Sequence, residues 1–143
     1  MSIEEHQSPD KATLDSIQKN VSYVKNQLSA ALGETLDLNA ESIELIDGYI
    51  NRTWERFNTS IKDSLVDVLG SFLGETISEV YGGEWRINNE GMLGIKFENN
   101  AWAFPFIKTC KHYINGHEDS IRSFFNAVPY IRGGSLRKNG ESK

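Results

Sequence analysis

The sequence predicts a mostly helical α+β fold, because its apolar residues change their period twice along the chain. They recur every three or four residues, the helical period, through residues 8–82 and again through residues 105–129. In between, over residues 84–104, they alternate with polar residues as in half-buried strands. The expected order is therefore three N-terminal helices, a three-stranded antiparallel meander and two short C-terminal helices.

The first helix is expected to begin at a capping Ser8 and to end at Gly33. A narrow seam of apolar side chains runs along it: Leu14, Ile17, Val21, Val24, Leu28 and Ala31. Such a seam packs on a single neighbour. That neighbour is another helix of the chain, or a second copy in a homodimer formed through residues 11–32; packing within the chain is the simpler reading.

Two further helices follow, each preceded by an asparagine suited to capping. Asn39 precedes the second helix and Asn58 the third, which ends at Gly82. The third helix is apolar on more than one side, which predicts that it is central and that Phe72 lies in the core. Gly74 lies four residues after Gly70 on it, so that another backbone can approach closely.

Strands are expected at 84–87, 93–98 and 101–104, separated by short polar turns. Trp85 in the first of them is predicted to be a core residue. Pro105 then opens a short helix, and the last helix is expected to begin at Glu118-Asp119-Ser120 and to end at Pro129.

Length and composition fit one cytoplasmic domain. The 143 residues suit a single α+β domain over residues 8–129, followed by a flexible basic tail, 130–143. One cysteine excludes an internal disulfide, no secretory signal opens the chain, and no apolar run is long enough to span a membrane. The net charge of −5 disfavours nucleic acid and favours a protein partner.

The search for chemistry yields no catalytic, cofactor or metal site. Cys110, His112 and His117 are close in sequence, but the first two are two residues apart on a helix and point in different directions. Cys110 is expected to be a small core residue, His112 and His117 to lie at the surface, and His6 to lie in a frayed terminus.

Glu75 stands out because it lies on the most apolar helix. A buried carboxylate needs hydrogen bonds or a cation. We expect Glu75 to bind backbone amides of a loop, or to pair with Arg86 or Lys108.

The run Leu69-Gly70-Ser71-Phe72-Leu73-Gly74-Glu75, followed by Gly82-Gly83-Glu84-Trp85, resembles the LGxxLGE…GGxW signature of a bacterial family of unknown function. The segments Phe104-Pro105-Phe106-Ile107-Lys108 and Asn115-Gly116-His117-Glu118-Asp119-Ser120 are similar to its second half. The resemblance covers about residues 40–129. It implies a bacterial, cytosolic origin and brings no activity, substrate or catalytic residue. The motif residues taken as candidates for function are Gly74, Glu75, Gly83, Trp85, Phe104 and Pro105.

These features lead to a small non-enzymatic protein-binding module, one form of which is an immunity-type inhibitor of a toxin. Acidic residues on the exposed side of the second helix, Glu44 and Asp47, are the expected partner contacts. One alternative is a small enzyme of unrecognised type centred on Glu75, Trp85 and Arg86. Another is a structural or ligand-sensing dimer.

Overall fold

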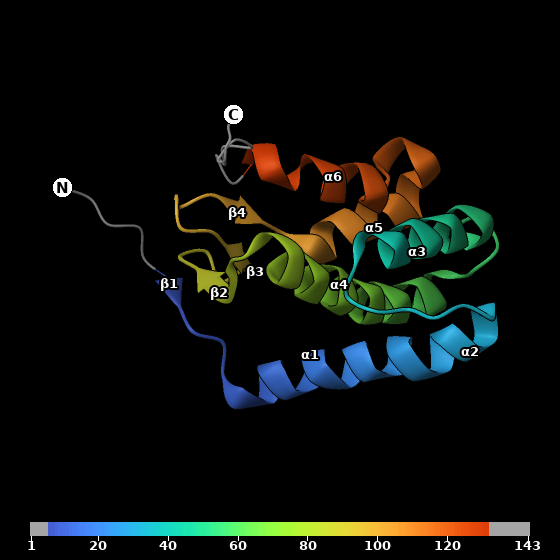
Figure 1. Ribbon diagram of the computed structural model, residues 1–143, viewed down its shortest axis with the longest axis horizontal. Coiled ribbons are helices and arrows are strands. Elements are labelled where there is room, and N and C mark those ends of the chain that lie inside the picture. Colours follow the sequence, from blue (N-terminus) through green and yellow to red (C-terminus); the bar gives the residue numbers. More distant parts are fainter. Residues whose placement is uncertain (1–5, 132–143) are drawn as a thin grey trace.

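The computed structural model describes residues 6–131, and it shows an α+β fold with a helical bundle capped at one end by a sheet (Figure 1). The helices are α1 Lys11–Tyr23, α2 Ser29–Leu32, α3 Ala40–Thr53, α4 Thr59–Tyr81, α5 Pro105–Asn115 and α6 Ile121–Ile131. The strands are β1 His6–Gln7, β2 Glu84–Asn88, β3 Leu93–Lys96 and β4 Trp102–Ala103. None of the helices in this part of the chain is long and apolar enough to cross a membrane.

The predicted meander is present, and a fourth strand extends it. β2, β3 and β4 pair antiparallel in sequence order, and β1 pairs antiparallel with the free edge of β2. His6 is therefore not in a frayed end, since it lies opposite Asn88 in the sheet. β1 is not predictable from the sequence, because two residues are too few to show an alternating pattern.

The first helix departs from the prediction at its start and in its middle. Asp10, not Ser8, is the N-cap: its carboxylate accepts the Thr13 amide at 2.8 Å. A π-helical turn, Val24–Leu28, interrupts the helix between α1 and α2, and Gly33 ends it as expected with φ +69°.

The apolar seam of the first helix is used inside the chain. Its buried residues are Ile17, Val21, Val24 and Leu28. They belong to the same core cluster as residues of α4, and α1 packs directly on α4. Asn20 adds a hydrogen bond from its side-chain amide to Ser71 Oγ at 3.0 Å. Four of the six residues of the seam on which a homodimer through residues 11–32 would rest are thus buried inside the chain, whereas Leu14 and Ala31, at its ends, are exposed.

α4 is the central element, as its apolar residues on several sides predicted. It lies between α1 on one side and α3, α5 and α6 on the other (Figure 1). Phe72, Leu73 and Ile77 have no exposed surface. Asn58 caps the helix by accepting the Ile61 amide at 2.9 Å, and Gly82 ends it.

The last helix is longer than predicted. α6 continues through Pro129 to Ile131, so that the first two residues of the expected tail, 130–143, are helical. Pro129 lies in the last turn, where it removes only the amide that would have bound the Phe125 carbonyl. The remainder of the predicted tail lies outside the described residues.

Candidate functional site

Four of the six motif residues meet where α4, the sheet and α5 join. A Cβ atom on Gly74 would lie 2.2 Å from the Trp85 ring and 3.0 Å from Pro105. Only glycine at this position lets the indole lie directly on the backbone of α4. The Trp85 Nε1–H donates to Glu75 Oε1 at 2.8 Å, so Glu75 joins the same contact. We call Gly74, Glu75, Trp85 and Pro105 the tryptophan junction.

The other two motif residues lie elsewhere. Gly83 has φ +97° and packs on Ile95 and Phe97 at the entrance to β2. Phe104 lies over Gly94 and stacks on Trp102, with the ring centroids 5.8 Å apart and the planes 4° from parallel. Gly83 and Phe104 therefore support the sheet, and Phe104 does so on the side away from the tryptophan junction.

The predicted cationic partners of Glu75 are engaged with other groups. Arg86 Nη1 donates to Ser8 Oγ, and Lys108 Nζ lies 5.3 Å from the centre of the Phe124 ring. Successive residues of a strand point to opposite faces, so Arg86 is directed away from the face that carries Trp85. The expected pairing of Glu75 with Arg86 or Lys108 is replaced by the hydrogen bond from the Trp85 indole.

This geometry gives Glu75 and Trp85 a structural role that mutation can test. Trp85→Phe should lower the free energy of unfolding by about 1–3 kcal/mol, because Glu75 loses a donor and the contact with Gly74 loses volume. Glu75→Gln keeps an acceptor for the indole and should change it by less than about 1 kcal/mol. Urea unfolding measures both. An equal loss of stability in the two variants would contradict the role assigned to the indole hydrogen bond.

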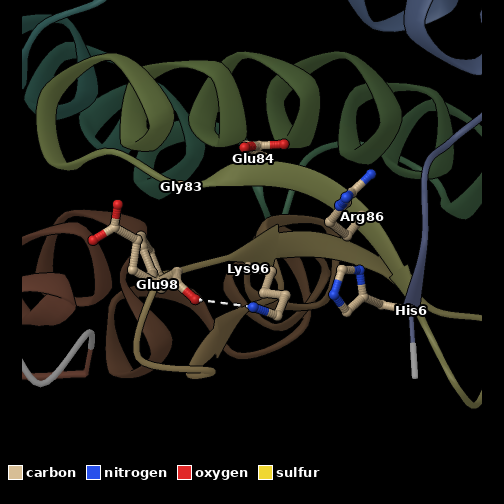
Figure 2. Close-up of a pocket in the computed structure, with 7 residues that line it drawn as sticks. His6, Gly83, Glu84, Arg86, Lys96 and Glu98 are labelled. Atoms are coloured by element: carbon tan, nitrogen blue, oxygen red, sulfur yellow. Dashed lines mark hydrogen bonds between the residues drawn. The ribbon is translucent and has the colours of Figure 1, made fainter. Parts of the chain in front are cut away.

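A pocket of about 200 Å³ lies on the outward face of the sheet (Figure 2). The residues that line it are His6, Gly83, Glu84, Arg86, Lys96, Phe97 and Glu98. Figure 2 places Arg86 and His6 at one end, Glu98 at the other and Lys96 between them. Lys96 Nζ donates to the Phe97 carbonyl at 3.3 Å, which keeps the ammonium inside the pocket. We call this the sheet pocket.

Aromatic side chains border the sheet pocket. The His6 ring meets Trp102 edge-on, with the centroids 6.4 Å apart, and Trp102 carries the stack with Phe104. Both Trp102 and Phe104 are partly exposed. The pocket lining contains two cationic side chains, those of Arg86 and Lys96, and the carboxylates of Glu84 and Glu98, so it offers contacts to groups of either charge.

A second polar cluster, with His112 and Asp47 buried and Asn51 exposed, lies between α3, α5 and the start of α6. His112 is fully buried; its Nε2 lies 2.7 Å from Asn51 Oδ1, and its Nδ1 accepts the Ile121 amide at 3.2 Å. Asp47 Oδ1 accepts the Ser120 hydroxyl at 2.6 Å and the Arg122 amide at 3.0 Å. Asn51 Nδ2 donates to Asp47 Oδ2 at 3.2 Å.

Three predictions about this region are wrong. Asp47 is only 7% exposed and binds the start of α6, so a partner cannot contact it, whereas Glu44 is exposed as expected. His112 is a core residue instead of a surface one. Cys110, expected in the core, is exposed.

The spacing of Asp47 contained a signal that would have placed it correctly. It is four residues after Ile43 and three before Ile50, so it lies on the buried face of its helix. The charge of Asp47 suggested that it is exposed to solvent, but its position on the helix predicted that it is buried. His112 and Tyr113 likewise follow Thr109 at helical spacing, and all three are buried.

Metal-binding groups do not gather in the described part of the chain: over residues 6–131 there is no cluster of three or more His, Cys, Asp or Glu side chains that could hold an ion. Exposed Cys110 and buried His112 point to opposite sides of α5.

Comparison with known proteins identifies no relative. No family model matches the chain, and no curated protein or solved structure is significantly similar to it. The resemblance to a bacterial family of unknown function therefore stays a prediction.

Proposed function

We propose that the protein is a non-enzymatic protein-binding module that contacts its partner with the outward face of the sheet. The observation that carries this proposal is the stacked, partly exposed Trp102–Phe104 pair, whose Trp102 contacts His6 in the lining of the sheet pocket. Tryptophan and arginine supply most of the energy at protein interfaces, usually beside pockets that exclude water. Mixed charge in the pocket lining suits a polypeptide surface better than a uniformly anionic nucleic acid.

An immunity-type inhibitor of a toxin is the specific form of this module that we propose. The net charge of −5 gives the protein an acidic field that would speed its association with a basic partner. Glu44, exposed on α3, contributes to that field, so that Glu44→Gln should lower the association rate and leave the dissociation rate almost unchanged.

A small enzyme centred on Glu75, Trp85 and Arg86 is the alternative, and the geometry favours it less. Glu75 and Trp85 are hydrogen-bonded to each other, but Arg86 leaves the opposite face of β2 and contacts Ser8. The three side chains do not converge on a common point, which a reaction centre requires.

The test compares substitutions on the sheet face with a charge reversal away from it. Tagged protein is used to capture partners from an extract of its source cells, and chemical cross-linking locates the contact. Trp102→Ala should weaken binding of a captured partner by about 30-fold, a typical interface hot-spot effect, and Lys96→Glu should weaken it by a smaller factor.

Lys19→Glu on α1 is the matched control, since it changes the net charge as Lys96→Glu does but lies on an exposed helix surface away from the sheet. It should alter only the association rate. Partner binding that survives both sheet-face substitutions, or cross-links confined to another face, would refute the proposed interface. Turnover of a small metabolite that Glu75→Gln abolishes would support the enzyme instead.

A further inference from the structure

The start of α6 is held by side chains from two other helices. The Ile121 amide donates to His112 Nδ1 on α5, and the Arg122 amide donates to Asp47 Oδ1 on α3. The first amides of a helix have no partner within it and need such acceptors. Ser120 takes part as well: its hydroxyl donates to Asp47 Oδ1, and its oxygen accepts the Ser123 amide.

The hydrogen bonds define the protonation state of His112. Since Nδ1 accepts the Ile121 amide, the proton of the neutral ring is on Nε2, which donates to Asn51 Oδ1. Asn51 then donates to Asp47 through its amide group. The network is closed, and it is satisfied by the neutral imidazole in this one tautomer.

A second proton on His112 is incompatible with this arrangement. It would remove the acceptor of the Ile121 amide and place an N–H group against another N–H group at the positive end of the α6 dipole. Asp47 Oδ1 lies 3.7 Å from His112 Nδ1, close enough to turn toward an imidazolium. It would then release the Ser120 hydroxyl and the Arg122 amide, its present donors.

Each element packed around His112 carries charged groups, of which Asp47, Asp119 and His117 act on its ring. α3 contributes Asp47, with Glu44 near Arg122 of α6 at 3.7 Å. The 3₁₀ turn Gly116–Asp119 contributes His117 and Asp119, and α4 contributes Lys62, which lies over the ring of Trp54 beside this turn. Burial lowers the pKa of His112 from 6.5; the carboxylates of Asp47 and Asp119 oppose the shift without cancelling it, and His117 adds to it.

We propose that His112, Asn51 and Asp47 form a proton-sensitive latch, which fixes the start of α6 while His112 is neutral and releases it when His112 is protonated. The latch has two states, which differ in what Asp47 binds: the start of α6, or the imidazolium of His112. Ile121 and Phe125 are buried while the latch is closed. Its release would expose them to solvent and so create an apolar surface between α3 and α5.

The direction of the pH effect follows from the direction of the pKa shift. The unfolded chain takes up a proton on this histidine near pH 6.5, before the folded chain does. The latch therefore contributes its full stability above pH 6.5 and loses it as the pH falls from 6.5 through the lower folded pKa.

Hydrogen exchange of the wild-type protein between pH 7.5 and 4.5 tests the latch. Protection factors, corrected for the intrinsic pH dependence of exchange, should fall by about tenfold or more for the amides of Ile121 and Arg122. Those of α4 and β3 should stay nearly constant. The midpoint should coincide with that of the His112 ring resonances followed by NMR in the same samples.

Two substitutions complete the experiment. His112→Asn places an oxygen near the former Nδ1 position and does not titrate, so protection of α6 should no longer depend on pH in this range. His117→Asn, on the exposed turn, should keep the wild-type dependence. If His112→Asn does not fold, the proposal is tested by the wild-type protein alone: the pH midpoint of α6 protection must coincide with that of the His112 ring resonances. Unchanged α6 protection, simultaneous loss of protection in α4, or a midpoint that follows His117 would each overturn the proposal.

Discussion

Phe72→Ala should lower the free energy of unfolding by about 3–5 kcal/mol, a large part of the stability of a domain of this size. Phe72 has no exposed surface and lies on α4, which contacts helices on both sides of the bundle. Neighbouring residues such as Leu73 and Ile77 are equally buried, so the surroundings cannot collapse freely into the space left by the ring. Urea unfolding followed by circular dichroism measures the change.

Ile61→Ala is the control for this experiment. Ile61 lies on the same helix but is 43% exposed, so its truncation should cost less than about 1 kcal/mol. A melting temperature unchanged by Phe72→Ala, combined with lost partner binding, would make Phe72 a binding residue and would contradict its place in the core.

The second large effect is expected for Asp47→Ala, with a loss of about 3 kcal/mol. Three donors lose their acceptor at once: the Ser120 hydroxyl, the Arg122 amide and the Asn51 side-chain amide. An unsatisfied buried donor costs about 1–3 kcal/mol, and those at the start of α6 recover part of this from water. Destabilisation should be accompanied by faster hydrogen exchange in the first turn of α6.

Glu44→Ala is the matched control: Glu44 is an acidic residue one turn earlier on α3, but it is exposed. Its carboxylate is 60% exposed and lies 3.7 Å from the Arg122 guanidinium, so its removal should change stability by less than about 0.5 kcal/mol. Similar losses in the two variants would show that Asp47 acts only through its charge and not through its hydrogen bonds.

Elements that depend on local chemistry were predictable from the sequence. Asn39 and Asn58 cap α3 and α4 as expected, each by accepting an amide three residues ahead. Pro105 begins α5, and Gly116, with φ +68°, follows its end. Capping, a fixed φ and a left-handed conformation are properties of a few adjacent residues, so they can be recognised without knowledge of the fold.

Short or irregular elements could not be predicted in this way. β1 forms because β2 has a free edge with which it pairs, and a two-residue segment carries no pattern that predicts this pairing. The π-helical turn, Val24–Leu28, keeps Val24 and Leu28 buried within one long helical segment and has no simple sequence signature. Pro129 is predicted to end the last helix, but the helix continues to Ile131, because a proline in the last turn removes only one hydrogen bond.

The orientation of α5 shows most clearly what periodicity cannot decide. Its apolar-looking stripe, Ile107, Cys110 and Ile114, faces solvent, and Ile114 is 62% exposed. The buried residues are Pro105, Thr109, His112 and Tyr113. α5 thus buries a partly polar face: partners for His112 are supplied by α3 and by the start of α6, and Thr109 donates to the Pro105 carbonyl of its own helix.

The sequence by itself determined the α+β class, the order of the helices and the meander, and a close approach to α4 at Gly74, because each rests on local spacing or on a residue with a special backbone. Only the tertiary structure decided that Asp47 and His112 are buried, that Glu75 binds an indole, and that the sheet pocket exists. The physical reason is that a buried polar group needs a hydrogen-bond partner, and for Asp47, His112 and Glu75 that partner comes from another element. Those partners, Asn51, Ile121 and Trp85 among them, are brought close by folding from distant or oppositely directed parts of the chain.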